Sequence, residues 1–193
     1  MAHPVFLIAG LGNPGDKYRR TRHNAGFLIL EGMARRWNLA TGGKPQTQFS
    51  AEIVRGRVRL PGDQHTADIV LLAPQTFMNR SGQSVGPALK FFQLAPAERL
   101  LVVHDEVELA FADIRRKTGG GHKGHNGVRD IMARLGNGDF ERIRFGVGRP
   151  EHGSVADYSL SNFAKDEQAE LEGLIDRAID LAEEWLLKRC GGS

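Results

Sequence analysis

The stretch Val5-Phe6-Leu7-Ile8-Ala9-Gly10-Leu11-Gly12-Asn13-Pro14-Gly15 decides the fold, because an apolar run leads directly into a glycine-rich turn. The apolar run in this stretch is Phe6–Ala9, and similar short, largely apolar runs occur at Ile69–Ala73 and Leu100–His104. Runs of this kind are typical of strands that are buried on both faces of an α/β sheet. Since sites in such folds gather at the carboxyl ends of strands, the turn predicts that Asn13 lies at a site.

Three more segments are candidate strands: Ala51–Val58, Asp113–Lys117 and Arg142–Val147. In Arg142–Val147 the apolar side chains alternate with arginines. Successive side chains of a strand point to opposite faces, so Arg142 and Arg144 are expected on the side away from the apolar residues.

Apolar stripes with helical spacing predict helices over Phe27–Trp37, Val128–Leu135 and Leu171–Leu186. Gly136 is placed to cap the second of these. Ser81–Gln93 predicts a weaker helix that Pro87 interrupts. The elements together predict an α/β fold, a single domain spanning residues 1–193, with a twisted mixed β-sheet flanked by helices on both faces. Gly42–Pro45 is expected to be a loop within this domain.

The composition is that of an ordinary globular protein of 193 residues, with 40% hydrophobic and 25% charged residues. No apolar run approaches the roughly 20 residues that a membrane helix needs. Val5–Leu11 is too short for one, and it lacks the positive flank of a signal peptide. The single cysteine, Cys190, cannot form an internal disulfide, which suits a reducing compartment. We therefore expect a cytoplasmic protein with no membrane partner.

The net charge is +3, but it is unevenly distributed. Residues 166–184 carry eight acidic side chains and one basic side chain, Arg177, so the rest of the chain holds +10. Basic clusters occur at Lys17–Arg22, Arg55–Arg59, Arg115–Lys117 and Arg142–Arg144. If these clusters share a face they favour a polyanionic partner, and if they are scattered they are ordinary solvated charge. The charge pattern alone does not choose between the two.

Gly10–Gly15 also matches the G-x-G-x-x-G pattern of dinucleotide-binding proteins. That pattern requires a helix to begin within the glycines and an acidic residue about 20 residues on, after the next strand. Here the polar segment Asp16–Arg22 follows the glycines, and Glu31 lies inside a helical pattern. The sequence therefore disfavours nicotinamide binding but leaves it as an alternative.

Two polar residues, His23 and Asp105, are candidates for acid–base chemistry. His23 opens a predicted helix, and Asp105 follows a predicted buried strand. A carboxylate can fix the tautomer of a histidine and stabilise its imidazolium form. Spacing does not show that the two side chains meet. Each also has an ordinary alternative, as an exposed histidine or as a helix or turn cap.

A loop after the strand Ile69–Ala73, Pro74–Gly82, supplies further polar groups. The amide of Asn79 is suited to donate to a developing oxyanion or to orient a water. Its neighbours Phe77 and Met78 offer an apolar surface for a base or side chain. Ordinary turn formation is the alternative explanation for Asn79.

The segment Lys117–Gly127 has five glycines among its last nine residues, directly before a predicted helix. Free backbone N–H groups at such a helix start attract phosphate. His122 and His125, with His104, raise the alternative of a metal site. The sequence has no cysteine pair and no H-E-x-x-H motif, which disfavours a metal.

Taken in order, these motifs resemble the bacterial-type peptidyl-tRNA hydrolases. The resemblance is carried by Gly10–Gly15, Tyr18, Thr21–Gly26, Pro74–Gly82, His104–Glu106, Gly119–Gly127 and Arg142–Pro150. It runs from about Val5 to the C-terminal helix. It implies a single α/β domain and an enzyme that cuts the ester between the 3′ ribose of tRNA and a peptidyl or N-blocked aminoacyl group, with no cofactor and no metal. Peptidyl-tRNA is then the partner, and no apolar surface stripe demands a dimer, so we expect a monomer.

The resemblance also implies roles for individual residues. His23 is the catalytic base and Asp105 its orienting partner, and Asn13 belongs with them. The residues that line or adjoin the site are Met78, Asn79, Asn126, His125 and Tyr18. The basic surface for the tRNA phosphates is formed by Lys117, Arg115 and Arg144.

The chain departs from the family pattern at Lys123, where many members have a small residue, and at Glu151–Ser154, which is shorter and less basic than in many relatives. Both departures concern tRNA contacts and not the proposed base. A non-catalytic tRNA-binding protein, a nicotinamide enzyme and a metal hydrolase remain open from the sequence. The lack of a G-x-S-x-G motif disfavours a covalent intermediate.

Overall fold

The computed structural model describes residues 3–39, 46–62 and 65–191, and its strands form one seven-stranded sheet. The strands are β1 (Val5–Gly10), β2 (Gln46–Gln48), β3 (Ala51–Arg59), β4 (Thr66–Pro74), β5 (Leu100–Glu106), β6 (Ile114–Thr118) and β7 (Glu141–Gly146). Their order across the sheet is β2-β3-β4-β1-β5-β7-β6. The four strands β4, β1, β5 and β7 are parallel, while β2, β3 and β6 pair with antiparallel neighbours. The predicted mixed sheet is confirmed. The predicted loop at Gly42–Pro45 lies outside the described residues.

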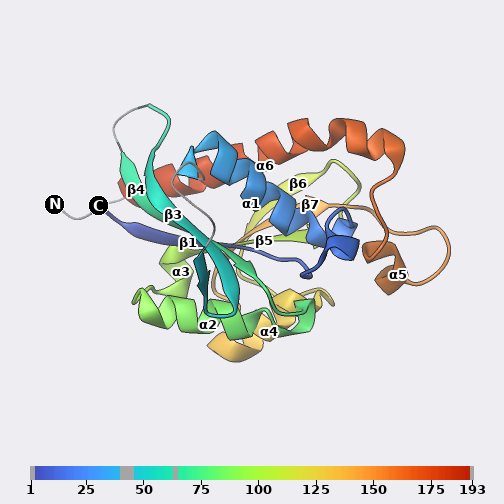
Figure 1. Cartoon of the computed structure of the whole chain (residues 1–193), viewed down its shortest axis with the longest axis horizontal. Helices are drawn as coiled ribbons and strands as arrows, with labels where there is room; N and C mark the ends of the chain where they lie inside the picture. Colours follow the sequence, from blue (N-terminus) through green and yellow to red (C-terminus); the bar gives the residue numbers. More distant parts are fainter. Residues whose placement is uncertain (1–2, 40–45, 63–64, 192–193) are drawn as a thin grey trace.

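Helices cover both faces of the sheet, as the sequence predicts (Figure 1). One face carries α1 (Ala25–Arg36) and the long α6 (Lys165–Gly191). The opposite face carries α2 (Gly82–Phe91), α4 (Asn126–Leu135) and the short α3 (Pro96–Arg99). The five-residue helix α5 (Val155–Ser159) lies apart from both layers, near the start of α1 (Figure 1).

The alternation of side chains along β1 divides the apolar interior into two cores. Phe6 and Ile8 pack under α1 and α6. There the centres of the Phe6 and Trp185 rings lie 5.2 Å apart in an edge-to-face arrangement. Leu7 and Ala9 pack under α2 and α4. Burying each large apolar side chain contributes about 1.5–3 kcal/mol. Burial on both sides explains why these strands are continuously apolar and do not alternate.

Two details of the helices test the predictions from sequence. Gly136 caps α4 with φ of 81°, a left-handed conformation that glycine adopts without strain, so the predicted cap is confirmed. The predicted interruption at Pro87 is wrong, because α2 continues through it. Proline removes one backbone hydrogen bond there, while Val85, Ala88 and Leu89 are buried around it. We attribute the continuity of the helix to that burial.

Arg142 lies on the predicted side of its strand, but its place in a basic surface cluster needs correction. Ile143 and Phe145 belong to the core under α1 and α6, as their alternation predicts. Arg142, however, is only 2% exposed, because its guanidinium donates to the carbonyls of the Gly119–Gly121 loop. It is therefore unavailable to the basic surface that the sequence suggested.

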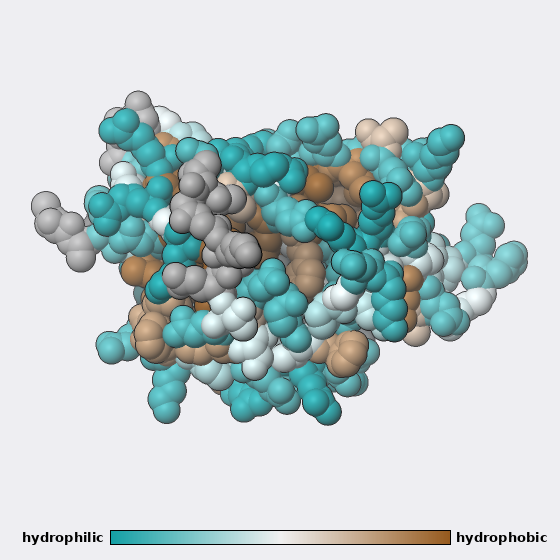
Figure 2. All heavy atoms as spheres, in the orientation of Figure 1, coloured by the Kyte–Doolittle hydropathy of each residue, from teal (hydrophilic) through white to brown (hydrophobic). Residues whose placement is uncertain are grey.

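The surface agrees with the ordinary composition of the chain. Hydrophilic side chains make up most of the face shown in Figure 2, and apolar side chains show between them and in a patch at the lower left. Within the described residues, no helix combines the length and the apolar character needed to cross a bilayer.

Candidate active site

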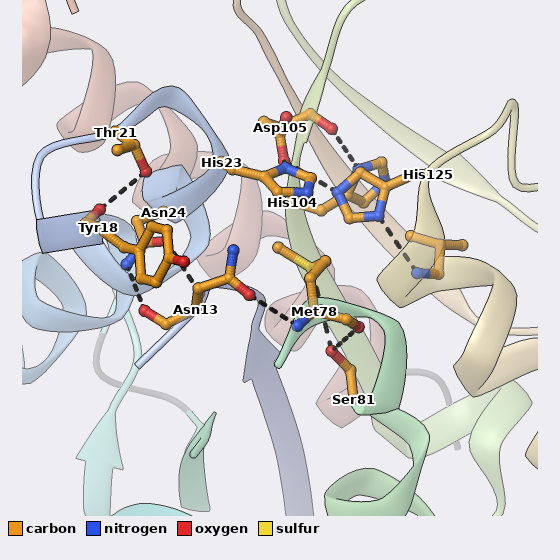
Figure 3. Close-up of polar contacts among 11 residues, drawn as sticks. Asn13, Tyr18, Thr21, His23, Asn24, Met78, Ser81, His104, Asp105 and His125 are labelled. Carbon is orange, nitrogen blue, oxygen red and sulfur yellow. Dashed lines mark hydrogen bonds and ion pairs between the residues drawn. The ribbon is translucent and has the colours of Figure 1, made fainter. Parts of the chain in front are cut away.

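His23 and Asp105, far apart in sequence, meet at the carboxyl edge of the sheet. His23 lies in the 3₁₀ turn η2 (Arg22–Asn24), directly before α1, and Asp105 is the sixth residue of β5. The His23 Nδ1 atom is 2.8 Å from Asp105 Oδ1. The carboxylate accepts the Nδ1–H, so the Nε2 atom of His23 carries the free lone pair. That atom lies on the side of Asn13 and Met78 (Figure 3).

The electrostatics of the pair favour a charged imidazolium. Burial alone would lower the pKa of His23, but the charge and hydrogen bond of Asp105 outweigh it, so the pKa is raised above the usual 6.5. Burial alone would raise the pKa of the Asp105 carboxyl. The positive charge of His23 and the hydrogen bonds from His23 and His125 instead hold that pKa far below its usual range. Asp105 is therefore an anion at neutral pH although it is only 2% exposed.

His125 is a second partner of Asp105. Its Nε2 atom is 2.9 Å from the same Oδ1, and its Nδ1 accepts from the Val128 backbone N–H at 3.3 Å, as the cap of α4. These two bonds require the Nε2–H form of the His125 ring. The fully buried His104 packs at 4.7 Å from His125, and burial holds the pKa of His104 well below the usual value. One carboxylate oxygen thus accepts from the rings of His23 and His125, and His125 in turn packs against the neutral ring of His104.

The metal alternative from sequence combined His104, His122 and His125. In the described part of the chain, the group with suitable ligand atoms is instead His23, Asp105 and His125. Their nitrogens lie 2.8 and 2.9 Å from the shared oxygen, which are ordinary hydrogen-bond distances. Two ligands bound tetrahedrally at the usual zinc distances would be about 3.3 Å apart. The spacing therefore fits protons between these atoms better than a cation.

The asparagine after β1 is held in one orientation. Asn13 Oδ1 accepts from the Met78 backbone N–H at 2.8 Å, and its own backbone exchanges two hydrogen bonds of 2.9 Å with the Asn24 side chain. The oxygen is thus engaged, and the amide nitrogen of Asn13 lies toward His23 (Figure 3). The turn therefore presents a fixed N–H donor next to the proposed base.

The glycines around this turn permit close backbone approach. A Cβ on Gly10 would lie 2.4 Å from the Gly26 carbonyl oxygen, and a Cβ on Gly26 would lie 2.3 Å from the Leu11 nitrogen. Strand β1 can therefore lie directly against the start of α1. The 3₁₀ turn η1 (Asp16–Tyr18) follows the glycines, and α1 begins only at Ala25. This geometry departs from the dinucleotide-binding pattern, in which the helix starts within the glycines.

These groups line a cleft of about 480 Å³. The predicted site residues that the structure brings to it are Asn13, His23, Met78, Asn79, Asp105, His125 and Asn126. Two exposed apolar side chains, Phe77 and Leu160, also line it. Lys123 is among the lining residues as well. Tyr18 is not among them; its backbone carbonyl instead accepts from the Thr21 hydroxyl.

The sequence did not predict one wall of this cleft. Val155, Ala156, Ser159 and Leu160 form it, from α5 and the residue that follows. This segment has no apolar stripe and no recognised motif, so periodicity gave no signal for it. Its contact with η2 is a tertiary feature.

The proposed basic surface lies on β6 and β7. Arg115 pairs with Arg144 in the antiparallel register, and Lys117 lies two residues farther along the same face. Arg115 also contacts Asp113 at 2.7 Å, and Arg144 lies 3.8 Å from Glu106. None of the three lines the cleft. They form a separate group, next to the glycine loop through Lys117, whose side chain lies against Gly120.

Comparison with known proteins identifies the family of this chain. The family model described as peptidyl-tRNA hydrolase matches residues 7–191. The peptidyl-tRNA hydrolase of Trichlorobacter lovleyi is 49% identical over 179 residues, and that of Geotalea daltonii is 44% identical over 179 residues; each alignment covers 93% of this chain and 88% of the relative. The crystal structure of peptidyl-tRNA hydrolase from Acinetobacter baumannii is 38% identical and superposes with a TM-score of 0.81, covering 99% of this chain and 96% of that one. The chain therefore belongs to the peptidyl-tRNA hydrolase family.

Proposed function

We propose that His23 is the general base of the reaction of this family, the hydrolysis of the ester between a peptide and the 3′ ribose of tRNA. The observation that carries this proposal is the 2.8 Å contact between His23 Nδ1 and the buried Asp105 carboxylate, at the cleft. In the neutral form of His23 that contact keeps the ring proton on Nδ1, so Nε2 is available to accept a proton from water. We propose that residues 1–193 act as one catalytic unit, because one sheet carries the whole arrangement.

The proposed reaction proceeds in two steps. His23 Nε2 removes a proton from a water while the water oxygen attacks the ester carbonyl carbon. The resulting tetrahedral intermediate carries a negative oxygen, and Asp105 stabilises the imidazolium that has formed. The intermediate then collapses and breaks the bond to the ribose 3′ oxygen, which takes the proton back from His23. The products are a peptide with a free carboxylate and a tRNA with a free 3′ hydroxyl. General-base help of this kind is worth about 10²–10⁴-fold.

Asparagine amides are the proposed partners of the oxyanion and of the peptide. The Asn13 amide is fixed through Met78, and the Asn126 Oδ1 accepts from Arg129 at 2.7 Å, which leaves its N–H₂ as the free end. A donor to the oxyanion lowers the barrier by about 3–4 kcal/mol. Amides that bond the peptide N–H and C=O would also reject a free, cationic α-amino group. If Asn13→Ala, Asn79→Ala and Asn126→Ala lowered turnover without relaxing discrimination against free aminoacyl-tRNA, this part would be wrong.

The remaining assignments concern partners. We propose that Lys117, Arg115 and Arg144 contact the tRNA phosphates, because they lie together on β6 and β7 outside the cleft. Tyr18 is proposed to contact the substrate from the turn before η2. We also propose a metal-independent monomer that acts in the cytosol.

Wild type and His23→Ala, compared on N-acetyl-aminoacyl-tRNA, test the function directly. We expect cleavage by wild type and a loss of at least about 10²-fold in the variant. Equal rates would remove His23 from the mechanism. Absence of cleavage by wild type would favour a non-catalytic tRNA-binding protein. A loss of activity with a chelator at constant Mg²⁺ would favour a metal hydrolase.

A further inference from the structure

Arg22, the residue before His23, is a buried arginine that the proposed mechanism does not use. It is 6% exposed and does not line the cleft. Its guanidinium reaches a segment about 140 residues away in sequence. It donates to Ser161 Oγ at 2.8 Å, to the Asn162 carbonyl and to Glu167 Oε2 at 2.5 Å. Three groups of the chain between α5 and the first turn of α6 thus converge on one side chain.

Aromatic rings and backbone bonds complete this contact. The Arg22 guanidinium carbon lies 4.2 Å from the centre of the Tyr158 ring and 5.5 Å from that of Phe163. The Arg22 backbone N–H donates to the Ser161 carbonyl at 3.0 Å, and Thr21 forms an isolated bridge with Asn162. The turn η2 and the segment after α5 are therefore docked on each other, with Arg22 between them.

The docked segment carries the wall of the cleft. Val155, Ala156, Ser159 and Leu160 line the cleft from α5 and its end. A helix of five residues is not stable alone, so its position depends on tertiary anchors. Besides Arg22, Tyr158 anchors α5 through its ring, which packs against the core, and through its hydroxyl, which donates to the Val147 carbonyl at 2.7 Å. The buried Phe163 holds the segment after α5 against the same core. Arg22 therefore joins the wall to the same turn that carries His23.

We propose that Arg22 is a positioning residue that fixes the α5 wall at its distance from His23 and so sets the fit of the substrate in the cleft. This inference rests on the proposed function of His23. Loss of Arg22 loosens the wall on the side of η2, although Tyr158 and Phe163 still hold it to the core, whereas His23 keeps its own bond to Asp105 on β5. Binding of the substrate should therefore suffer more than the chemical step.

The test compares Arg22→Gln and Arg22→Lys with wild type on N-acetyl-aminoacyl-tRNA. For Arg22→Gln we expect KM to rise about tenfold with kcat within about twofold, the pattern of lost ground-state binding. Arg22→Lys keeps the charge but not the planar fork, so KM should rise less. In both variants the acid limb of the pH profile of kcat/KM should keep its position, because the contact of Asp105 with His23 is untouched.

Two further variants separate positioning from general stability. Glu167→Gln removes the charge partner of Arg22 but keeps an oxygen to accept from the Ala164 N–H, which is 2.6 Å away, so it should raise KM in the same direction. Arg36→Gln is the matched control, because Arg36 also ties a helix to α6, through Asp176 and Asp180, away from the cleft. The KM of Arg36→Gln should equal that of wild type, even if the urea concentration at the midpoint of its unfolding is lower.

An unchanged KM in Arg22→Gln, with a lower urea midpoint like that of Arg36→Gln, would overturn the inference. A fall in kcat at constant KM would overturn it too, because Arg22 would then act on His23 and not on the wall. If Arg22→Gln does not fold, Arg22→Lys and Glu167→Gln give the same KM comparison. The proposed function fails separately, when His23→Ala cleaves as fast as wild type.

Discussion

Substituting Asp105 by asparagine isolates the electrostatic part of the proposed mechanism, because the side chains have nearly the same shape. In the wild-type protein the Asp105 charge outweighs the effect of burial on the pKa of His23 and raises it above 6.5. In Asp105→Asn the burial remains and the charge is gone, so the pKa of His23 should fall below 6.5. Activity requires neutral His23, and the acid limb of the pH profile of kcat/KM should therefore move to lower pH.

The size of the effect follows from the contact. The His23 Nδ1 and Asp105 Oδ1 atoms are 2.8 Å apart, so removing the Asp105 charge takes away the interaction that raises the pKa of His23. An asparagine that turns its N–H₂ group toward His23 would favour a proton on Nε2, the wrong tautomer for a base. The variant thus lacks the carboxylate that stabilises the His23 imidazolium and the bond that keeps the neutral ring in its Nδ1–H form. Together these losses should lower kcat/KM by about 10³–10⁴-fold at neutral pH.

The assay is the cleavage of N-acetyl-aminoacyl-tRNA from about pH 5 to 9, a range that spans the titration of histidine. Asp176→Asn is the matched control, since Asp176 is 57% exposed on α6 and pairs with Arg36. A variant Asp105→Asn whose acid limb coincides with that of wild type, at a rate within twofold, would refute the reasoning.

Stability offers a second measurement on the same variant. The native pKa of Asp105 is depressed, so its contribution to folding is fully present above the unfolded value of 3.8 and is lost as the pH falls toward the native value. The difference in unfolding free energy between wild type and Asp105→Asn should therefore narrow below about pH 4, as measured by urea titration.

The other predictions concern packing and tRNA binding. Gly26→Ala should destabilise the protein by about 2–3 kcal/mol in urea unfolding, because the new Cβ would lie 2.3 Å from the Leu11 nitrogen and 2.5 Å from the Val103 carbonyl oxygen. Gly173→Ala is its control: the space around Gly173 on α6 is open, so this change should stabilise by about 1 kcal/mol, and an equal loss in both variants would contradict the packing argument. Lys117→Ala should weaken tRNA binding and reduce the slope of log K against log salt by about 0.7–0.9, whereas an unchanged slope would mean that Lys117 does not contact a phosphate.

Much of the fold and of the cleft could be predicted from local sequence. The apolar runs identified the central strands because those strands are buried on both faces. The polar groups at or just beyond the carboxyl ends of β1, β4 and β5 meet because the carboxyl ends of parallel strands share one edge. Asn13, Asn79 and Asp105 line one cleft for that reason. The contact between His23 and Asp105 could not be predicted from spacing, and it required the β1–α1 approach at Gly10 and Gly26.

Two features were missed because their causes are not local. The strand pattern predicted that Arg142 faces away from the core, but it could not show that loop carbonyls cover it. The α5 wall has little apolar character, and its position depends on Arg22, far away in the chain. In both cases a buried arginine satisfies backbone carbonyls of a distant segment, and no periodic pattern records such a partner.

The construction of the cleft from two sources has a consequence for protein engineering. Its floor consists of strand ends and glycine contacts where even one added methyl group would collide with backbone. Its wall is a short helix on the surface, with Ala156 and Leu160 exposed. A library that varies Val155, Ala156 and Leu160 would alter which peptide side chains the cleft admits. The same library would leave the proton-transfer apparatus on β5 and η2 intact, so substrate range and turnover become separately adjustable traits.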